Sequence, residues 1–513
     1  MTAHPLVPTS SSSHPNGVTK HSSQGAQASG GRGRFATRAI HVGSEPQLSA
    51  SGGVNPALDL STTFYQSSVG TLRAGFEYAR SANPTRLAYE RLLASLEGAD
   101  EGLRETLEAE RSIAVGEEGA FEQWTKENGP AALAFSSGSA ATATVVQALV
   151  GNGGHIVSVG DVYGGSSRYF LKVASPLQGA ETTFVDLSYR DVEGGIDSSD
   201  SKDVRREKED GAILDRLERA IRPDTKVIWL ETPTNPMLNL VPIALIARVA
   251  KNHNIPLAVD NTFASPYLQS PLSLGATVVL ASSTKYISGH SDVIGGYIAT
   301  SSPPLLAKLR FLQNAHGAIP SPFDCYLLLR SIKTLPLRIR QHSLNGLAVA
   351  RYLQEVAIPA GLVRDVRYPG LKRSQETPAQ ERERELAWDQ LTPEYKRWLA
   401  AQGFNRETEG GFPVGGMVSF HIASASEKSQ EETGAAERFL EGLKVFTLAE
   451  SLGGVESLAE LPIKMTHGGV DPSHRASLGI DGELIRLSVG VEDVDDLLAD
   501  LKQALEDATK TLA

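Results

Sequence analysis

VVLASSTKYISGHSDVIGGYI, residues 278–298, begins as an apolar run with strand character and then changes to hydroxyl side chains, one lysine and a Gly/His/Asp turn. Lys285 is therefore expected just past the end of a buried strand. Partial burial disfavours the ammonium form and leaves a nucleophilic amine, so Lys285 is a candidate for Schiff-base chemistry. A lysine that merely ends a strand and faces water fits this stretch equally well by itself.

The hydroxyl residues before the lysine suggest an anion site. Ser282 and Thr284 are two residues apart, so on extended chain their side chains point the same way. Both hydroxyls could then donate hydrogen bonds to one phosphate group.

A second stretch, IPLAVDNTFASPYL at residues 255–268, predicts a buried strand that delivers Asp260 at its carboxyl end, followed by Asn261 and Thr262. Ligands of parallel sheets gather beyond the carboxyl ends of the strands. A lysine and a carboxylate meeting there fit the two ends of pyridoxal phosphate, the lysine at the aldehyde and Asp260 at the ring nitrogen. An ordinary strand-end role for Asp260 remains open at this point.

Together, AVDNTFASP and SSTKYISGHSD resemble the trans-sulfuration enzymes of cysteine and methionine metabolism, over about residues 38–508. The resemblance implies pyridoxal 5'-phosphate as cofactor and the aspartate-aminotransferase type of fold (fold type I). This is an α/β fold with a mostly parallel central sheet and a smaller C-terminal α+β domain. Within the family, the sequence is most similar to cystathionine gamma-lyases.

Composition is consistent with this class of protein. The chain has 513 residues, 41% hydrophobic and 21% charged, and a net charge of −11, which argues against a nucleic-acid surface. No apolar run reaches the length of a membrane span. Cys325 is the single cysteine, which excludes an intrachain disulfide and a Cys-based metal cluster and suits a reducing compartment. We expect Cys325 to be packed in a helix.

Changes in composition, together with the resemblance, suggest the domain organisation. The predicted parts are a disordered tail (1–34), an N-terminal arm that reaches the neighbouring subunit (35–98), a large cofactor-binding domain (99–320) and a long helix with a small domain (321–513). Two charged insertions are expected in the large domain, an exposed helical excursion at about 100–130 and a mobile loop at 189–211. Residues 374–411 are predicted to be a helical, polar surface segment.

Hydrophobic patterning predicts the elements of both domains. Alternating strands and helices over residues 131–300 indicate a mostly parallel sheet with helices on both faces. A long helix over about 322–356 should lead into a small sheet formed by GGMVSFHI, KVFTLA and ELIRLSVG. The last helix should cover this sheet with one apolar face, which carries Leu497, Leu498, Leu501 and Leu505.

The resemblance assigns further cofactor contacts. Tyr78 and Arg80, in YARSANPT, would bind the cofactor phosphate of the neighbouring subunit, so a monomer should be inactive. Gly138 and Ser139, at the start of a predicted helix, would be phosphate ligands, and backbone N–H groups at a helix N-terminus favour that role. Tyr163, just past a strand end, would stack on the cofactor ring and handle a proton of the leaving thiolate.

It also assigns the substrate contacts. Arg486 would bind the substrate α-carboxylate, assisted by Ser451, although a structural salt bridge is the simpler explanation of a buried arginine. Asn235 would contact the ring oxygen and the substrate carboxylate. Glu450 would attract a distal ammonium group of the substrate.

The expected activity is therefore γ-elimination of L-cystathionine to L-cysteine, 2-oxobutanoate and ammonia, with release of hydrogen sulfide from cysteine or homocysteine by the same machinery. Lys285 would act as general base at Cα. Cystathionine gamma-synthase, which adds cysteine to an activated homoserine, is the main alternative. The presence of Lys285, Asp260, Tyr163 and Arg486 together argues against a non-catalytic homologue. The absence of a GxGxxG motif after the early strands argues against an NAD-binding protein. The family implies a cytoplasmic homotetramer built of dimers that share active sites.

Overall fold

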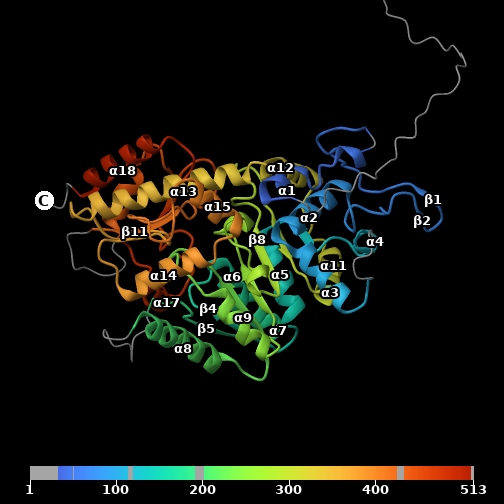
Figure 1. Cartoon of the computed structure of the whole chain (residues 1–513), viewed down its shortest axis with the longest axis horizontal. Coiled ribbons are helices and arrows are strands. Elements are labelled where there is room, and N and C mark those ends of the chain that lie inside the picture. The colour runs from blue at the N-terminus through green and yellow to red at the C-terminus, as the bar shows by residue number, and fades with distance from the viewer. Residues whose placement is uncertain (1–32, 50, 114–119, 191–200, 424–432, 510–513) are drawn as a thin grey trace, which may run out of the picture.

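The computed structural model describes residues 33–49, 51–113, 120–190, 201–423 and 433–509. Nearly all of the predicted disordered tail lies outside these ranges, and so does most of the first half of the predicted loop at 189–211. Two sheets organise the described residues, a larger one at the centre of the molecule and a smaller one at the left in Figure 1.

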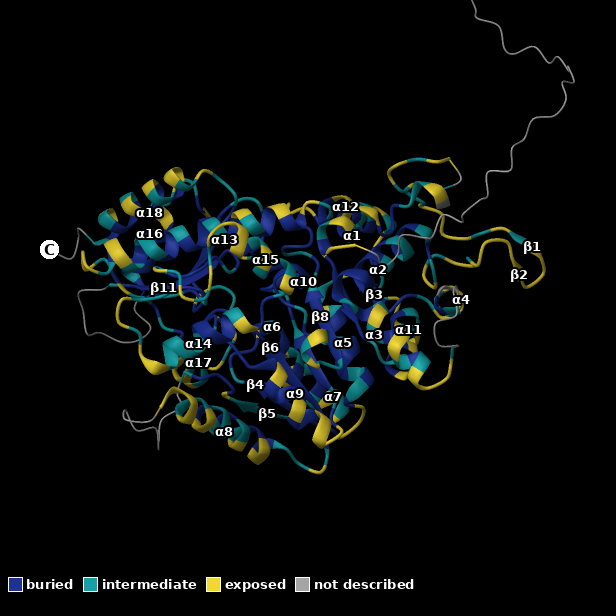
Figure 2. Cartoon of the chain, in the orientation of Figure 1, coloured by how far each residue is buried: buried dark blue, intermediate teal, exposed yellow. Residues whose placement is uncertain are grey.

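The larger sheet has seven strands within the described residues. In spatial order these are β3 (Ala132–Phe135), β9 (Gly296–Ala299), β8 (Val278–Ser282), β7 (Leu257–Asp260), β6 (Thr225–Glu231), β4 (His155–Val159) and β5 (Glu181–Val185). The ladders from β8 to β5 are parallel, and β9 runs antiparallel to both of its neighbours. Apart from the edge strand β5, which is half-buried, the strands are buried almost throughout, as expected of apolar runs in a parallel sheet (Figure 2).

The smaller sheet lies in the C-terminal part of the chain. Its strands, in spatial order, are β10 (Val363–Arg367), β11 (Met417–Ile422), β14 (Leu484–Ser488), β13 (Leu458–Glu460) and β12 (Thr447–Leu448). The last helix, α18 (Val494–Thr509), packs on α16 (Gly434–Gly442) and α13 (Leu335–Tyr352). Leu497, Leu501 and Leu505 of α18 are fully buried, so the predicted apolar face is confirmed.

Helices surround both sheets. Those before β8 are α1 (Phe35–His41), α2 (Pro84–Glu97), α3 (Ala99–Ala109), α4 (Ala120–Asn128), α5 (Gly138–Leu149), α6 (Gly164–Tyr169), α7 (Ser175–Gln178), α8 (Lys202–Ala220), α9 (Ile243–Asn252) and α10 (Ser265–Leu268). The remaining ones are α11 (Pro303–His316), α12 (Pro322–Ile332), α14 (Pro378–Asp389), α15 (Pro393–Ala401) and α17 (Pro472–Leu478). A short hairpin of β1 (Gln66–Ser68) and β2 (Thr71–Leu72) projects at the right in Figure 1. No helix within the described ranges is both long and apolar enough to cross a membrane.

Local sequence explains where α2 begins and ends. The side chain of Asn83 accepts hydrogen bonds from the N–H groups of Thr85 and Arg86, and Pro84 occupies the first turn, where no N–H is needed. Gly98 ends the helix with φ +73°, a conformation that favours glycine. The helices α1 and α2 belong to the predicted arm, but they pack in the core of their own chain. The domain boundaries themselves stay a prediction.

Two segments that we expected on the surface contribute to the core instead, and a third is a helix. Leu103 and Leu107 of α3 are buried, so α3 is not an exposed excursion. Tyr395 and Leu399 of α15 are fully buried in the core of the larger sheet. In both helices, apolar residues at helical spacing lie among charges that dominate the local composition. Residues 202–211 are the first half of α8, capped by Ser201, and not a loop.

The elements after β8 also differ in detail from the expectation. The predicted long helix is two helices, α12 and α13, and Pro336 lies in the first turn of α13, where a missing N–H is tolerated. Cys325 is buried in α12, as predicted. KVFTLA contributes only the edge strand β12, and β13 was missed because its three residues carry too little periodicity.

Ion pairs between α8 and the chain around α14 hold these segments together. The carboxylate of Glu385, of which only 2% is exposed, receives Lys202 at 2.7 Å, Arg206 at 2.6 Å and Arg406 at 3.3 Å. Burial opposes ionisation, but the hydrogen bonds from Arg206 and Lys202 outweigh it and hold the pKa of Glu385 below its ordinary value. The predicted loop at 189–211 is thus ordered over its second half by charge pairing.

We expect Glu385→Gln to lower the free energy of unfolding by about 2 kcal/mol at pH 7, because four cations, including Arg382 at 3.8 Å, lose a buried charged partner. Because the pKa of Glu385 is lower in the folded than in the unfolded chain, its ionised carboxylate stabilises the fold fully above the unfolded pKa of about 4.3. This stabilisation is lost as the pH falls through the folded-state pKa. The difference from the wild type, measured by urea unfolding, should therefore shrink below about pH 4. The exposed Glu441→Gln is the control, and an equal effect of both variants would contradict the role of Glu385.

Candidate active site

Three parallel strands end side by side and deliver polar residues to one edge of the larger sheet. Glu231 ends β6, Asp260 ends β7 and Ser282 ends β8. The strand register places Glu231 beside Asp260, and Asp260 beside Leu280. Lys285 follows β8 in the next turn, so the predicted lysine and aspartate do arrive at neighbouring strand ends.

Lys285 lies where an amine is partly removed from water. Its Nζ donates a hydrogen bond to Ser451 Oγ at 2.8 Å, across the boundary between the two sheets. Burial lowers the pKa of Lys285 to about 8, with a further contribution from the positive charge of Arg486. A substantial fraction of the amine is therefore neutral and nucleophilic near neutral pH.

Asp260 is held by Thr262. The N–H and the Oγ1 hydroxyl of Thr262 both donate to Asp260 Oδ1, at 2.9 Å and 2.5 Å, and burial raises the pKa of Asp260 against these bonds. Thr262 Oγ1 in turn accepts the N–H of Ser282 at 2.9 Å. Since both bonds from Thr262 end on Oδ1, Oδ2 can receive a cationic N–H donor.

Glu231 is a site residue that the sequence analysis missed. Its two carboxylate oxygens accept the backbone N–H groups of Tyr163, at 2.8 Å, and Asn235, at 2.9 Å. Burial, and next the charge of Asp260, raise the pKa of Glu231 well above its ordinary value. A carboxylate at the end of an apolar strand, KVIWLE, was the available signal, and it matches the pattern that identified Asp260.

An anion site lies at the start of α5. Ser137 caps the helix by accepting the N–H of Ala140, while Gly138 and Ser139 form its first turn. A Cβ on Gly138 would lie 3.0 Å from the Cβ of Ser282, so glycine lets this helix end approach β8 closely. Backbone N–H groups thus lie beside Ser282, and binding of a phosphate by Gly138, Ser139 and Ser282 stays a prediction. Thr284 lies in the turn after β8. Its hydroxyl accepts a hydrogen bond from the N–H of Gly295 at 3.0 Å and donates one to the carbonyl of Gly295 at 3.3 Å.

Arg486 reaches the same edge from β14 of the smaller sheet. Its guanidinium, only 2% exposed, donates to Asn235 Oδ1 at 2.9 Å and to the Ser451 carbonyl at 2.7 Å. It also pairs with Glu460 at 2.9 Å. Glu460 is fully buried on β13, burial raises its pKa, and its position in a strand that was not predicted is why it was missed.

Ser451 connects the lysine and the arginine. Its backbone has φ +94°, a left-handed conformation that typically costs a non-glycine residue about 1–3 kcal/mol. In this conformation the hydroxyl meets Lys285 and the carbonyl meets Arg486. The strained backbone is therefore used to present two groups of one residue to two cationic side chains.

Two predicted residues lie at the rim of the site. Tyr163 is 39% exposed, follows β4 and adjoins the first turn of α6, and partial burial raises the pKa of its phenol. Glu450 is exposed, and its negative charge acts on both Tyr163 and Lys285.

Tyr78 and Arg80 do not join this cluster within the chain. Arg80 donates to the carbonyl of Asn314 at 3.1 Å, and its guanidinium lies over the ring of Tyr78 at 5.7 Å. Both side chains are exposed, and Tyr78 forms an isolated bridge with Thr63. Their role toward a neighbouring subunit therefore stays a prediction.

Comparison with known proteins identifies the family. The sequence pattern of the family described as "Cys/Met metabolism PLP-dependent enzyme" matches residues 36–106, 124–387 and 401–506. The chain belongs to this family. Cystathionine gamma-lyase of Saccharomyces cerevisiae is 41% identical over 480 residues, 93% of this chain and 98% of the yeast protein. The corresponding enzyme of Sus scrofa is 42% identical over 480 residues, 93% of this chain and 95% of its own.

Solved structures of the Cys/Met metabolism family agree with the fold. The crystal structure of cystathionine gamma-lyase from yeast has a TM-score of 0.71 and 39% identity and covers 93% of this chain and 99% of its own. Cystathionine gamma-synthase from Xanthomonas oryzae pv. oryzae, in complex with cystathionine, has a TM-score of 0.71 at 33% identity, with the same coverage. The predictions of the family, the fold class and pyridoxal phosphate as cofactor are confirmed.

The residues present fit the cofactor of the Cys/Met metabolism family. The mostly buried amine of Lys285 suits the aldehyde, and the buried carboxylate of Asp260, with one oxygen open to a donor, suits the ring nitrogen. The N-terminus of α5, beside the Ser282 hydroxyl, suits the phosphate. Among the described residues, no group of three or more His, Cys, Asp and Glu side chains could hold a metal ion.

In the cofactor-free protein, the Lys285 amine should be acylated by acetic anhydride with a pH midpoint near 8, because burial and Arg486 disfavour its ammonium form. Mass spectrometry after brief labelling at increasing pH would measure this midpoint, with the exposed Lys308 as internal reference. A midpoint near 10.4, the ordinary lysine value, would contradict the description of the site.

Proposed function

We propose that this chain catalyses the γ-elimination of L-cystathionine, which consumes one water and yields L-cysteine, 2-oxobutanoate and ammonia. The observation that carries the proposal is the convergence of Lys285 and Arg486 on Ser451. An amine base and a guanidinium that can bind a carboxylate are thereby held at one residue. The similarity to cystathionine gamma-lyases over nearly the whole chain supports the choice of substrate.

Each end of the cofactor has a group to hold it. Lys285 would bind the aldehyde, Asp260 the protonated ring nitrogen, and Thr262 would fix the carboxylate of Asp260. Gly138, Ser139, Ser282 and Thr284 would bind the phosphate. Bound pyridoxal phosphate supplies an electron sink for negative charge at the substrate Cα.

The other side chains act on the substrate. Arg486, oriented by Asn235, would fork the α-carboxylate, and Lys285, with its lowered pKa, would take the proton from Cα. The Tyr163 ring would cover the cofactor face, and its phenol, protonated because its pKa is raised, would give a proton to the leaving thiolate. Glu450 would attract the distal ammonium group of cystathionine. The same residues would release hydrogen sulfide from cysteine or homocysteine.

A gamma-synthase activity is the second candidate. The solved gamma-synthases from Xanthomonas oryzae pv. oryzae share the fold at TM-score 0.71, one of them in complex with cystathionine. A synthase would use the same lysine and carboxylates and differ in the acceptance of an O-acylhomoserine and of cysteine as nucleophile. The lyase remains the proposal because the similar curated proteins named above are lyases.

We expect the purified holoenzyme to release 2-oxobutanoate from L-cystathionine at least about tenfold faster than it forms cystathionine from O-acetyl- or O-succinylhomoserine and cysteine. A ketoacid assay and chromatography of cystathionine would measure the two rates. Lys285→Ala should abolish both, because the base and the cofactor anchor are lost together. The reverse preference would move the assignment to the synthase, and turnover by Lys285→Ala would end both candidates.

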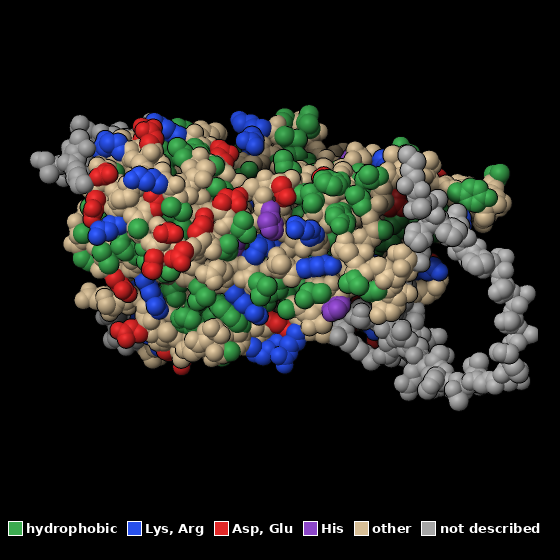
Figure 3. Space-filling view, turned by 90° about the horizontal axis from the view of Figure 1, so that it is seen from above, with side chains coloured by type: hydrophobic (Ala, Val, Ile, Leu, Met, Phe, Trp, Pro, Cys, Tyr) green, Lys and Arg blue, Asp and Glu red, His purple; other side chains and the backbone are tan. Residues whose placement is uncertain are grey.

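We further propose a homotetramer built of active-site-sharing dimers, located in the cytoplasm. Large apolar side chains on the surface, such as Phe311, Phe323 and Leu337, are more than half exposed. Hydrophobic side chains also gather right of centre on the face seen in Figure 3, toward α12, whereas acidic ones lie mostly toward α18. Exposed apolar groups of this kind are typical of subunit interfaces. Tyr78 and Arg80, exposed beside the projecting β1–β2 hairpin, would then reach the phosphate of the partner site.

Subunit complementation would test the shared site. Arg80→Ala and Lys285→Ala should each be inactive alone, but an equal mixture refolded together should recover about a quarter of the wild-type activity. Half of the dimers would be hybrids, each with one intact site. Mixing the variants without dissociation is the control. Failure of the refolded mixture to regain activity, with dimers confirmed by light scattering, would place Arg80 in its own subunit's site.

A further inference from the structure

A short segment outside the family match reaches the back of the candidate site. Residues 388–400 lie between the matched ranges 124–387 and 401–506 and comprise the end of α14, the connection 390–392 and most of α15. Gln390, the residue that caps the end of α14, is only 8% exposed. Its side chain is buried and meets Gln269, which lies in the chain after β7.

Gln390 is one end of a buried chain of amide hydrogen bonds. Its Nε2 donates to Gln269 Oε1 at 3.2 Å, and its Oε1 accepts the N–H of Ile243 at 2.9 Å. Gln269 Nε2 donates in turn to Asn261 Oδ1 at 3.0 Å and to the carbonyl of Thr232 at 2.9 Å. Asn261 closes the chain by donating to the carbonyl of Gln269 at 2.9 Å. Every polar atom of the Gln269 amide is therefore engaged.

The far end of this chain lies directly behind the two carboxylates of the site. Asn261 follows Asp260 at the end of β7, and Thr232 follows Glu231 at the end of β6. The Gln269 amide thus joins the first residues beyond both strands. The β6–β7 ladder places Glu231 beside Asp260, and the Gln269 amide ties together the residues that follow them.

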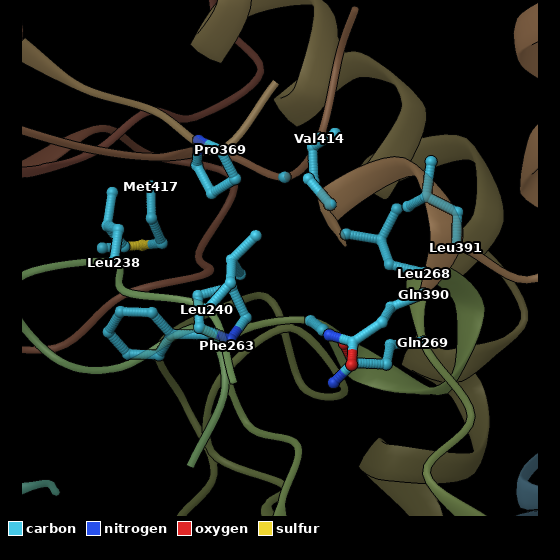
Figure 4. A pocket seen from close by; sticks show the side chains of 14 residues that line it. Leu238, Leu240, Phe263, Leu268, Gln269, Pro369, Gln390, Leu391, Val414 and Met417 are labelled. Atoms are coloured by element: carbon cyan, nitrogen blue, oxygen red, sulfur yellow. The ribbon is translucent and has the colours of Figure 1, made fainter. Parts of the chain in front are cut away.

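The surroundings make each of these bonds important. A cavity of about 30 Å³ adjoins the chain, and Figure 4 shows the amides of Gln269 and Gln390 at one end of it, among apolar side chains such as Leu268 and Leu391. All other side chains that line this cavity are apolar. In such a low-dielectric place an unpaired amide is costly, and a satisfied one is held in a single orientation.

The backbone fixes Gln390 in this position. Leu391 forms an isolated antiparallel bridge with Gln269. The N–H of Thr392 donates to the Leu268 carbonyl at 2.8 Å, and its hydroxyl donates to the Tyr267 carbonyl at 2.7 Å. The segment is therefore docked on the chain after β7 on both sides of the glutamine contact.

We propose that Gln390 is a positioning residue for the cofactor-binding carboxylate Asp260, acting through Gln269 and Asn261. Its N–H donor selects the orientation in which Gln269 Oε1 faces α14 and Nε2 faces the strand ends. Without that donor, Gln269 Oε1 is left unpaired beside apolar side chains, and the bonds of Nε2 to Asn261 and Thr232 are held less firmly. The proposal rests on the proposed function only for the contact between Asp260 and the cofactor ring.

The test compares holoenzymes that carry Gln390→Met, which keeps the shape but removes the amide, and Gln390→Asn, which keeps a shorter amide. The measurements are the pH dependence of the cofactor absorbance band, the Kd of the apoenzyme for pyridoxal phosphate, and kcat and KM for cystathionine. We expect Gln390→Met to shift the pH midpoint of the band by about 0.5 unit. It should also weaken cofactor binding and lower kcat by roughly threefold to tenfold, with little change in KM. Gln390→Asn should lie between this variant and the wild type.

Two controls separate positioning from general destabilisation. Leu399→Ala removes a buried apolar side chain from α15 in the same segment and should lower Tm without moving the absorbance midpoint. Gln402→Leu changes an exposed glutamine after α15 and should leave all of the measurements unchanged. The proposal is overturned if Gln390→Met moves the midpoint and the cofactor Kd no more than Leu399→Ala does. If Gln390→Met does not fold, the same comparison is made with Gln390→Asn, and an unshifted midpoint is equally decisive.

The absorbance and the cofactor Kd need no substrate, so they distinguish this inference from the proposed function. A wild-type protein that binds the cofactor but does not cleave cystathionine would refute the proposed lyase and leave the spectral comparison intact. Normal cleavage by all variants, with identical spectra, would refute the role of Gln390 alone.

Discussion

The hydrogen bonds that Ser451 makes to Lys285 and Arg486 join the two halves of the candidate site. One residue from the smaller domain's region presents its hydroxyl to the amine after β8 and its carbonyl to the guanidinium on β14. The two contacts require the left-handed backbone conformation of Ser451, so the protein tolerates backbone strain at this residue. Lys285 and Arg486 come from the regions of different sheets, so their separation depends on how the two sheets pack.

Burial of charge is the second constraint. Glu231 and Asp260 lie side by side at the ends of β6 and β7, with the raised pKa values that burial imposes, and Glu231 also holds the backbone of Tyr163 and Asn235. Two adjacent buried carboxyls repel one another when both are ionised. A cationic ring nitrogen at Asp260 would relieve that repulsion, which gives the protein an electrostatic reason to bind its cofactor.

The charged chain around α14, which leads into the unmatched residues 388–400, is part of the same structure. The buried carboxylate of Glu385 collects cations from α8 and from the chain after α15. Five residues later, Gln390 enters the core behind the strand ends. A segment that is polar by composition can therefore be ordered from both sides, by ion pairs toward solvent and by amide bonds toward the sheet.

Much of the fold and of the site could be predicted from local sequence. Apolar runs that end in Asp260 and in Ser282 to Lys285 determine where the strands stop, because parallel strands in a buried sheet must be apolar and polar residues mark their ends. Asn83-Pro84 and Ser137-Gly138 determine helix starts, because capping chemistry is local. Glu460 and Gln390 could not be predicted in their roles, since their partners lie 26 and 121 residues away in sequence. Only the tertiary structure, through burial and long-range hydrogen bonds, decided which polar residues became core contacts and which stayed on the surface.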